Sequence, residues 1–452
     1  MRKEIEVAPR RPDSQVTVHT SLLFDSKHKK LVSETSIVID TQTGLITKVF
    51  KREKQLPSHN ISSSNTIDLR GLTVLPGLVD AHTHIFLHSY SETPSINQER
   101  DESFIERIVR ATNHAKSALD AGYTTYRDLG TEGLRDADVH FRDTINRGII
   151  PGPRMFVATE CITSSGGYEI RQENGMPGGT TVPRLSDAAE GVDGVRAAVR
   201  RRLGAGADIV KFYADYRKRQ LRFPPAAWPG AKEIMFPPSG NFFSGDRNPS
   251  LLQFTQEEMN EMVAEAKRGK APIAAHALSP EGVIMAAKAG VTSVEHGLAY
   301  DGHKPSEEAL QALKENGTIF VPTLSVFDAE LHRGGGDKDA ERDLKVVLDH
   351  AKAAFDKGVK LATGGDTGAI AHGENAREIE LMVEAGIPIL DVLQNATLHG
   401  WDSCGGDLCG RKFGLVEEGW AADLIALDGN PTEDIGAIRK VKFVMKDGKV
   451  YK

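Results

Sequence analysis

Residues 76–85 read PGLVDAHTHI, an apolar run that follows a Pro-Gly turn and ends in two histidines. Apolar runs bounded by turns are typical of buried strands, so His82 and His84 are expected near the end of such a strand. Residues i and i+2 of a strand share a face, which brings both imidazoles within reach of one transition metal. A single histidine there could equally satisfy a core hydrogen bond, but the pair on an apolar strand favours a metal.

Downstream of this run, strand-like apolar segments alternate with amphipathic helical segments to about residue 400. Seven further strands are predicted at residues 124–129, 154–159, 208–213, 272–277, 293–297, 319–323 and 360–366. Helices are predicted between them at residues 102–119, 193–203, 256–267, 280–289 and 344–357. Eight βα repeats indicate an α/β protein built on a (β/α)8 TIM barrel, and a doubly wound open sheet is the alternative.

Both ends of the chain have a different pattern, with short alternating strands separated by Gly, Ser, Asn and Asp-Gly turns. We predict a small β-sandwich domain formed by both termini. Residues 1–75 would be its N-terminal part, residues 76–405 the barrel and hydrolase domain, and residues 406–452 its C-terminal part. The pattern alone does not show that the two parts touch.

Composition narrows the class of protein. Hydrophobic residues make up 39% and charged residues 26% of the 452 residues, as in ordinary globular enzymes. The net charge of -7 gives no reason to expect nucleic acid or an anionic membrane as a partner. Three cysteines are too few for a disulfide framework, and the first residues lack the apolar segment of a secretory signal. We therefore expect a cytoplasmic homo-oligomer that acts on a small molecule.

The candidate ligands fall at or near the carboxyl ends of predicted strands, where a barrel builds its active site. They are His82, His84, Lys211, His276, His296 and Asp366. Four neutral imidazoles and a carboxylate make a full ligand set for zinc or a similar divalent ion. His276 or His296 alone could be a core histidine, so it is the recurrence on successive strands that favours a metal site.

Five motifs occur in this order: PGLVDAHTHI, IVKFYADYR, AAHALSPEG, SVEHG and GGDTGA. Together they resemble the metal-dependent amidohydrolase superfamily, and within it the imidazolonepropionase-like group that includes Xaa-Pro dipeptidases and an ochratoxin-hydrolysing amidase. The resemblance covers nearly the whole chain and implies a (β/α)8 barrel, a β-sandwich and a hydrolytic site with one or two metals. It implies that His82 and His84 bind the more buried metal, that His276 and His296 bind the other, and that Asp366 lies beside the nucleophilic water.

Lys211 separates the one-metal from the two-metal version of this site. An ammonium cannot bind a cation, whereas a lysine carboxylated by carbon dioxide is an anionic ligand able to bridge two ions. Lys211 stands where the binuclear relatives carry this lysine, and imidazolonepropionase itself lacks it. The plain alternative is a strand-end lysine paired with a carboxylate. We expect two divalent ions, zinc by preference, and a carboxylated Lys211.

These ions imply hydrolysis of an amide bond, because two cations activate a bridging water and polarise the scissile carbonyl. Asp366 would act as general base and return the proton to the leaving nitrogen, although it could also be only a metal ligand. The expected substrate is an N-acyl amino acid, a dipeptide or an ochratoxin-like amide. The alternatives are a one-metal cyclic-amide hydrolase or deaminase, and a non-catalytic protein of the same fold.

Substrate contacts are predicted on the long connections. Tyr213 and Tyr168 could donate to the oxyanion and contact the substrate, or be ordinary exposed tyrosines. Arg217 could bind a substrate carboxylate, although a solvated charge run is the commoner outcome. His140 and His372 are weaker candidates for substrate binding. Leu278 stands in a segment where the amidase relatives often carry a second histidine, which weakens transfer of one specific activity.

Overall fold

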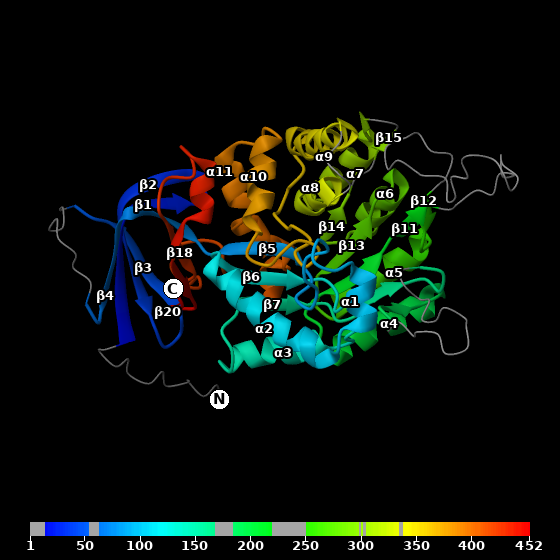
Figure 1. Ribbon diagram of the computed structural model, residues 1–452, viewed down its shortest axis with the longest axis horizontal. Helices are drawn as coiled ribbons and strands as arrows, with labels where there is room; N and C mark the ends of the chain where they lie inside the picture. Colours follow the sequence, from blue (N-terminus) through cyan, green and yellow to red (C-terminus); the bar gives the residue numbers. More distant parts are fainter. Residues whose placement is uncertain are drawn as a thin grey trace, which may run out of the picture.

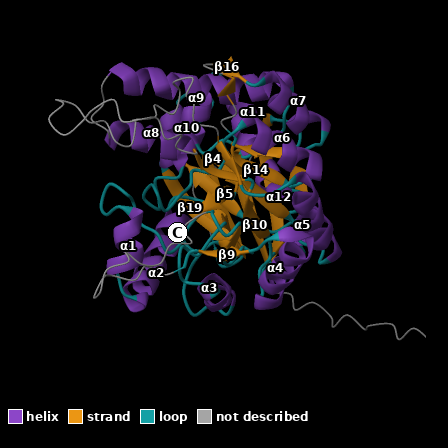
Figure 2. Ribbon diagram, turned by 90° about the vertical axis from the view of Figure 1, so that its right-hand side faces the viewer, coloured by secondary structure: helices purple, strands orange, loops and turns teal. Residues whose placement is uncertain are grey.

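The computed structural model describes residues 14–53, 63–167, 184–218, 250–297, 300–301, 304–333 and 338–452. This part of the chain is an α/β protein. A sheet made from both ends of the chain stands at one side of a larger body of parallel strands and helices (Figure 1). Seen from the other end, helices surround the strands of this larger body (Figure 2).

The terminal sheet has seven strands in the order β20-β19-β18-β4-β1-β2-β3. They are β1 (Gln15–Asp25), β2 (Lys30–Asp40), β3 (Leu45–Lys51), β4 (Thr66–Pro76), β18 (Leu424–Leu427), β19 (Val441–Lys446) and β20 (Lys449–Val450). Strand β18 pairs antiparallel with β4, which sets Leu424 opposite Pro76. The two ends of the chain are thus directly hydrogen-bonded, and alternate residues such as Val18, Ile37 and Val74 form the apolar core of the sheet.

The parallel strands form a three-stranded sheet, β5-β6-β7, and a six-stranded sheet, β17-β14-β13-β10-β8-β9. Their bounds are β5 (Leu78–Thr83), β6 (Tyr123–Asp128), β7 (Arg154–Val157), β8 (Cys161–Thr163), β9 (Ser186–Ala188), β10 (Val210–Tyr213), β13 (Ile273–Ala277), β14 (Ser293–His296) and β17 (Ile319–Val321). Seven of the eight predicted strands are therefore present. Short antiparallel pairs join β11 (Asp215–Lys218) to β12 (Ser250–Leu252) and β15 (Tyr300–Asp301) to β16 (Lys304–Pro305).

Single backbone hydrogen bonds connect these sheets to each other. The Asp208 amide donates to the Val157 carbonyl at 2.8 Å, and the Ala81 amide donates to the Thr363 carbonyl at 2.9 Å. The Phe320 amide donates to the Lys360 carbonyl at 2.8 Å. Hydrogen bonds therefore run from β5 through the parallel strands to residues 360–363 and back to β5.

The predicted strand at residues 360–366 is not a regular strand. It makes only isolated bridges to its neighbours, such as that between Phe320 and Leu361. The reason lies in its close approach to β5, since a Cβ atom on Gly364 would lie 2.7 Å from the His82 amide nitrogen. Asp366 then adopts a left-handed backbone with φ of 58°, which ends the extended run.

The predicted helices correspond to α2 (Phe104–Asp120), α4 (Gly191–Ala205), α5 (Gln256–Arg268), α6 (Pro280–Ala289) and α9 (Lys338–Lys357). Others were not predicted: α1 (Ser95–Asp101), α3 (Ala137–Asn146), α7 (Glu307–Glu315), α8 (Leu324–Arg333), α10 (Ala376–Glu384), α11 (Ile389–Asn395), α12 (Leu398–Ser403), and the 3-10 turns η2 (Gly406–Cys409) and η3 (Ile435–Arg439). Local signals start several of them: Ser103 caps α2, and Thr255 with Glu258 forms a capping box on α5. None of the helices within the described ranges is long and apolar enough to cross a bilayer.

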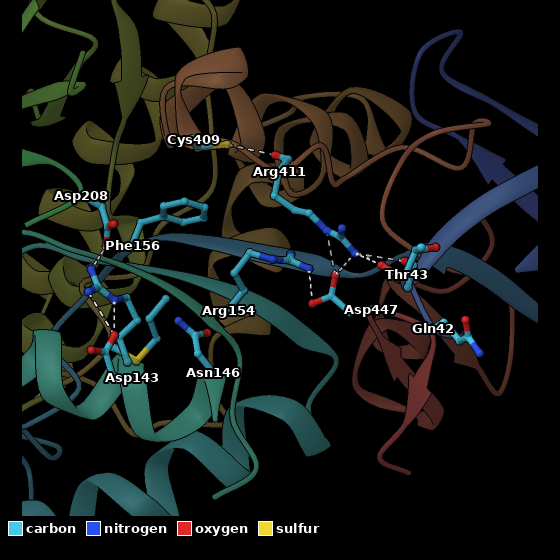
Figure 3. A pocket seen from close by; sticks show the side chains of 13 residues that line it. Gln42, Thr43, Asp143, Asn146, Arg154, Phe156, Asp208, Cys409, Arg411 and Asp447 are labelled. Atoms are coloured by element: carbon cyan, nitrogen blue, oxygen red, sulfur yellow. Dashed lines mark hydrogen bonds and ion pairs between the residues drawn. The ribbon is translucent and has the colours of Figure 1, made fainter. Parts of the chain in front are cut away.

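Arg154 ties the terminal sheet to the parallel strands (Figure 3). Arg154 on β7 donates to Asp423 at 2.7 Å and lies 2.8 Å from Asp447, while Arg411 lies 2.6 Å from Asp447. They line a cavity of about 570 Å³ at the boundary. Its charges pair with each other, so we assign this cavity to the attachment of the terminal sheet rather than to chemistry.

Close packing of α12 against β5 predicts a stability effect at Gly400. A Cβ atom there would lie 2.5 Å from the Val79 Cβ, so Gly400→Ala must displace the strand that carries His82. We expect a loss of about 1–3 kcal/mol in the free energy of unfolding, measured by urea denaturation. Gly204→Ala in α4 is the matched control, because its Cβ would meet nothing within 4 Å. Equal effects of the two substitutions would contradict the packing argument.

Candidate active site

A cavity of about 200 Å³ opens at the carboxyl ends of the parallel strands. It brings together all six predicted ligands, which come from β5, β10, β13 and β14 or directly after them and from the segment 360–366. The described residues that line it are His82, His84, Tyr90, Glu132, Lys211, Tyr213, Tyr216, His276, Leu278, His296, Val326, Phe327, Glu330 and Asp366.

Asp366 lies at the centre of the histidine cluster. Its Oδ1 atom is 3.6 Å from His82 Nε2 and 3.3 Å from His84 Nε2. One ligand atom each from His82, His296 and Asp366 lies within 4.8 Å of the others. The His276 and His296 rings lie next to each other, with their centroids 4.5 Å apart. Side chains at these distances can bind one cation together.

The far nitrogen of three imidazoles is held by the protein. His82 Nδ1 lies 3.0 Å from Glu295 Oε2, and His296 Nδ1 lies 2.8 Å from Thr323 Oγ1. His84 Nδ1 donates to the Gly130 carbonyl at 2.9 Å. Such bonds orient a ligand histidine and choose its tautomer. His276 Nε2, in contrast, is buried and has no hydrogen-bond partner within the described part of the chain.

Burial keeps most of the cluster uncharged. It lowers the pKa of His82 to about 4 and the pKa values of His276 and His296 well below the usual value. His84 is the exception: burial opposes its charge, but Asp366 and Glu132 raise its pKa to about 9. Burial alone would raise the pKa of Asp366, yet the neighbouring histidines hold it far below the usual range. The cavity therefore offers three neutral imidazoles, those of His82, His276 and His296, and an ionised carboxylate beside a protonated His84.

The backbone is bent where the strands end. His296 has φ of 67°, Thr323 has φ of 51° and Asp366 has φ of 58°, all in the left-handed region that non-glycine residues rarely adopt. Each such residue costs about 1–3 kcal/mol and persists only where its surroundings hold it. Here the bends turn side chains from parallel strands toward one point.

Lys211 on β10 is 2% exposed and faces the same cavity. Burial lowers the pKa of its ammonium, which favours the neutral amine. The charges of Glu295 and Asp366 oppose this shift.

The match to the amidohydrolase family spans residues 73–451. The chain belongs to the amidohydrolase family. It is an enzyme that hydrolyses carbon–nitrogen bonds, as its sequence motifs predicted.

Two relatives illustrate the similarity of this amidohydrolase to known proteins. Ochratoxinase of Aspergillus niger is 30% identical over 425 residues, which cover 88% of this chain and 80% of the relative. The crystal structure of a Xaa-Pro dipeptidase with bound methionine has a TM-score of 0.76 and 32% identity, over 97% of this chain and all of that one. The crystal structure of A. niger ochratoxinase has a TM-score of 0.74 and 26% identity, over 97% and 96% of the two chains.

Of the remaining predicted site residues of the amidohydrolase, some lie in the cavity and others do not. The Tyr213 ring lies in the cavity, with its centroid 4.5 Å from that of His276. Tyr168 lies outside the described residues, and Arg217 is described only by its backbone in β11. His140 is exposed on α3, and His372 stacks on the His114 ring at 4.2 Å. Neither of these last two histidines lines the cavity, and His372 Nε2 instead lies 3.0 Å from the Leu87 carbonyl oxygen.

Several residues of the site were not predicted. Tyr90, Glu132, Tyr216 and Glu330 line the cavity from connections and from α8, where no local pattern marks them. Glu295 and Arg127 lie behind His82 and form an ion pair of 2.7 Å. Their strands, YTTYRD and SVEH, contain other polar residues as well, so no local pattern singled out the pair.

Proposed function

We propose that this amidohydrolase is a metal-dependent enzyme that cleaves an amide bond in an N-acyl amino acid, a dipeptide or an ochratoxin-like amide. The observation that carries the proposal is the convergence of four histidines, Asp366 and Lys211 on one cavity. The similarity to ochratoxinase and to a Xaa-Pro dipeptidase supports an amide substrate.

The residues fit a centre with two divalent ions, zinc by preference. Neutral imidazoles are the form that binds a cation, and the buried His276 Nε2 has no other use among the described residues. His82 and His84 would hold one ion, His276 and His296 the other, and a carboxylated Lys211 would contact both. Bound divalent ions supply an activated water and polarise the scissile carbonyl.

Side chains of the protein supply proton transfer and oxyanion binding. Asp366 takes the proton of the attacking water and returns it to the leaving nitrogen, a role that its central, ionised carboxylate suits. Tyr213 donates from the cavity wall to the oxyanion. Tyr168 and Arg217 stay predictions for the oxyanion and for a substrate carboxylate.

We further infer that the linked parallel strands and residues 360–366 form the predicted (β/α)8 barrel. The backbone bonds that lead from β5 around to β5 again support closure. The domain boundaries at residues 75 and 405 fit the end of β4 at Pro76 and the start of η2 at Gly406. The terminal strands would form the smaller β-sandwich domain on this scheme.

Metal analysis and a substrate screen test this function together. We expect about two zinc ions per chain after loading, and release of amine from dipeptides or N-acyl amino acids but not from metal-free protein. The screen also includes lactams and aryl esters. Close to one ion per chain, with no dependence on bicarbonate, would favour the one-metal alternative. Protein that binds no divalent ion and cleaves nothing would favour the non-catalytic alternative.

A further inference from the structure

Glu295 lies between His82 and Arg127 in the interior, on the far side of His82 from the cavity. Its side chain has 0% exposure. Its Oε2 atom lies 3.0 Å from His82 Nδ1, and its Oε1 atom accepts from Arg127 Nη2 at 2.7 Å and from Ser293 Oγ at 2.5 Å. One buried carboxylate therefore joins a predicted metal ligand on β5 to an arginine on β6.

Arg127 is itself held by four different acceptors. Besides Glu295, it donates to the Ala81 carbonyl at 2.5 Å, to Ser293 Oγ at 2.7 Å and to the Ser403 carbonyl at 3.0 Å. The guanidinium is planar and only donates, so these bonds fix which Glu295 oxygen faces it. The other oxygen is thereby directed at His82.

Counting donors and acceptors assigns the His82 tautomer. Glu295 Oε1 already accepts two hydrogen bonds, and a carboxylate can only accept, so the His82 Nδ1 atom opposite Oε2 must carry the proton. The lone pair is then on Nε2, the atom that lies 3.6 Å from Asp366 Oδ1 in the cluster. We propose that Glu295 and Arg127 are positioning residues that hold His82 in the tautomer able to bind a metal ion.

This inference rests on the proposed metal-dependent function but makes its own claim. A purely structural pair would tie β5, β6 and β14 together and leave the His82 proton unspecified. The positioning role requires in addition that the accepting oxygen of Glu295 determines which nitrogen of His82 carries the proton. The structural role and the positioning role therefore predict different results when the accepting oxygen of Glu295 is replaced by a hydrogen-bond donor of the same shape.

Glu295→Gln makes that change. Arg127 and Ser293 still donate, so the amide oxygen must face them and the amide NH2 must face His82. His82 Nδ1 would then accept, and the proton would move to Nε2, where it blocks a metal. We expect zinc affinity at the His82 site to fall about 10–100-fold, measured by competition with a chromophoric chelator. The 15N resonances of histidine in the metal-free protein would show that the proton of His82 is on Nδ1 in the wild type and on Nε2 in the variant.

Asp423→Asn is the matched control, because it removes a buried carboxylate from another arginine pair, with Arg154, on the terminal sheet. We expect its zinc affinity to equal that of the wild type. Equal loss in both variants, or unchanged zinc affinity in Glu295→Gln, would overturn the proposal. If Glu295→Gln fails to fold, the wild-type tautomer still decides: a proton on His82 Nδ1 supports the proposal and a proton on Nε2 overturns it. A wild-type protein that binds no zinc would sink the metal-dependent function while leaving the tautomer measurement to judge this inference.

Discussion

Lys211→Ala is expected to lower kcat/KM for the best amide substrate by roughly 10³-fold, because loss of the bridging ligand removes several kcal/mol of metal-assisted stabilisation. The zinc content should fall below two per chain in the same variant. Lys211 is buried, and burial favours the neutral amine, the form that can attack carbon dioxide. Steady-state kinetics with parallel metal analysis measure both effects.

Small carboxylic acids should restore part of this loss. Acetate or propionate can occupy the space left by the side chain and present two oxygens, as the carboxylated lysine would. Lys446→Ala is the matched control, since Lys446 is a second buried lysine whose pKa burial lowers, to about 8, and it donates to the Gly152 carbonyl far from the cavity. Its activity should change little and should not respond to acetate. A Lys211→Ala protein with full zinc content and full rate would rule out a carboxylated lysine.

Asp366→Asn is expected to lower kcat by about 10²–10⁴-fold on amide substrates. The neighbouring histidines hold the pKa of this carboxyl well below its usual range, so it is deprotonated throughout the neutral range, as a general base must be. An asparagine keeps the shape but cannot take the proton of the attacking water. The measurement is kcat on a dipeptide or N-acyl amino acid with the variant loaded with zinc.

A comparison of leaving groups separates proton transfer from mere metal binding. An amide nitrogen must be protonated as it leaves, whereas an activated aryl ester leaves without a proton. If Asp366 moves the proton, the loss should be much larger for the amide than for the ester at equal zinc content. An equal loss on both substrates, with less zinc bound, would mean that Asp366 is only a ligand.

Local pattern was sufficient for most of the fold. The period of two in residues 76–85 predicted that His82 and His84 lie close together, although β5 ends at Thr83 and His84 follows it, and helical periodicity located α2, α4, α5, α6 and α9. It was not sufficient at residues 360–366, where Gly364 lets the chain pass close to β5 without a regular ladder. It also could not show the pairing of β18 with β4, which joins segments separated in the sequence by all of the parallel strands.

The sequence by itself determined the chemical kinds of the predicted ligands and placed most of them at strand ends, because residue type and strand period are local properties. Only the tertiary structure decided how those side chains are held. Glu295 meets His82 across 213 residues, and Arg127 meets Glu295 across 168. The tertiary structure also decided that Tyr213 lines the cavity while His140 and His372 do not. Such contacts depend on where distant strands come to lie, and no local pattern in the chain records them.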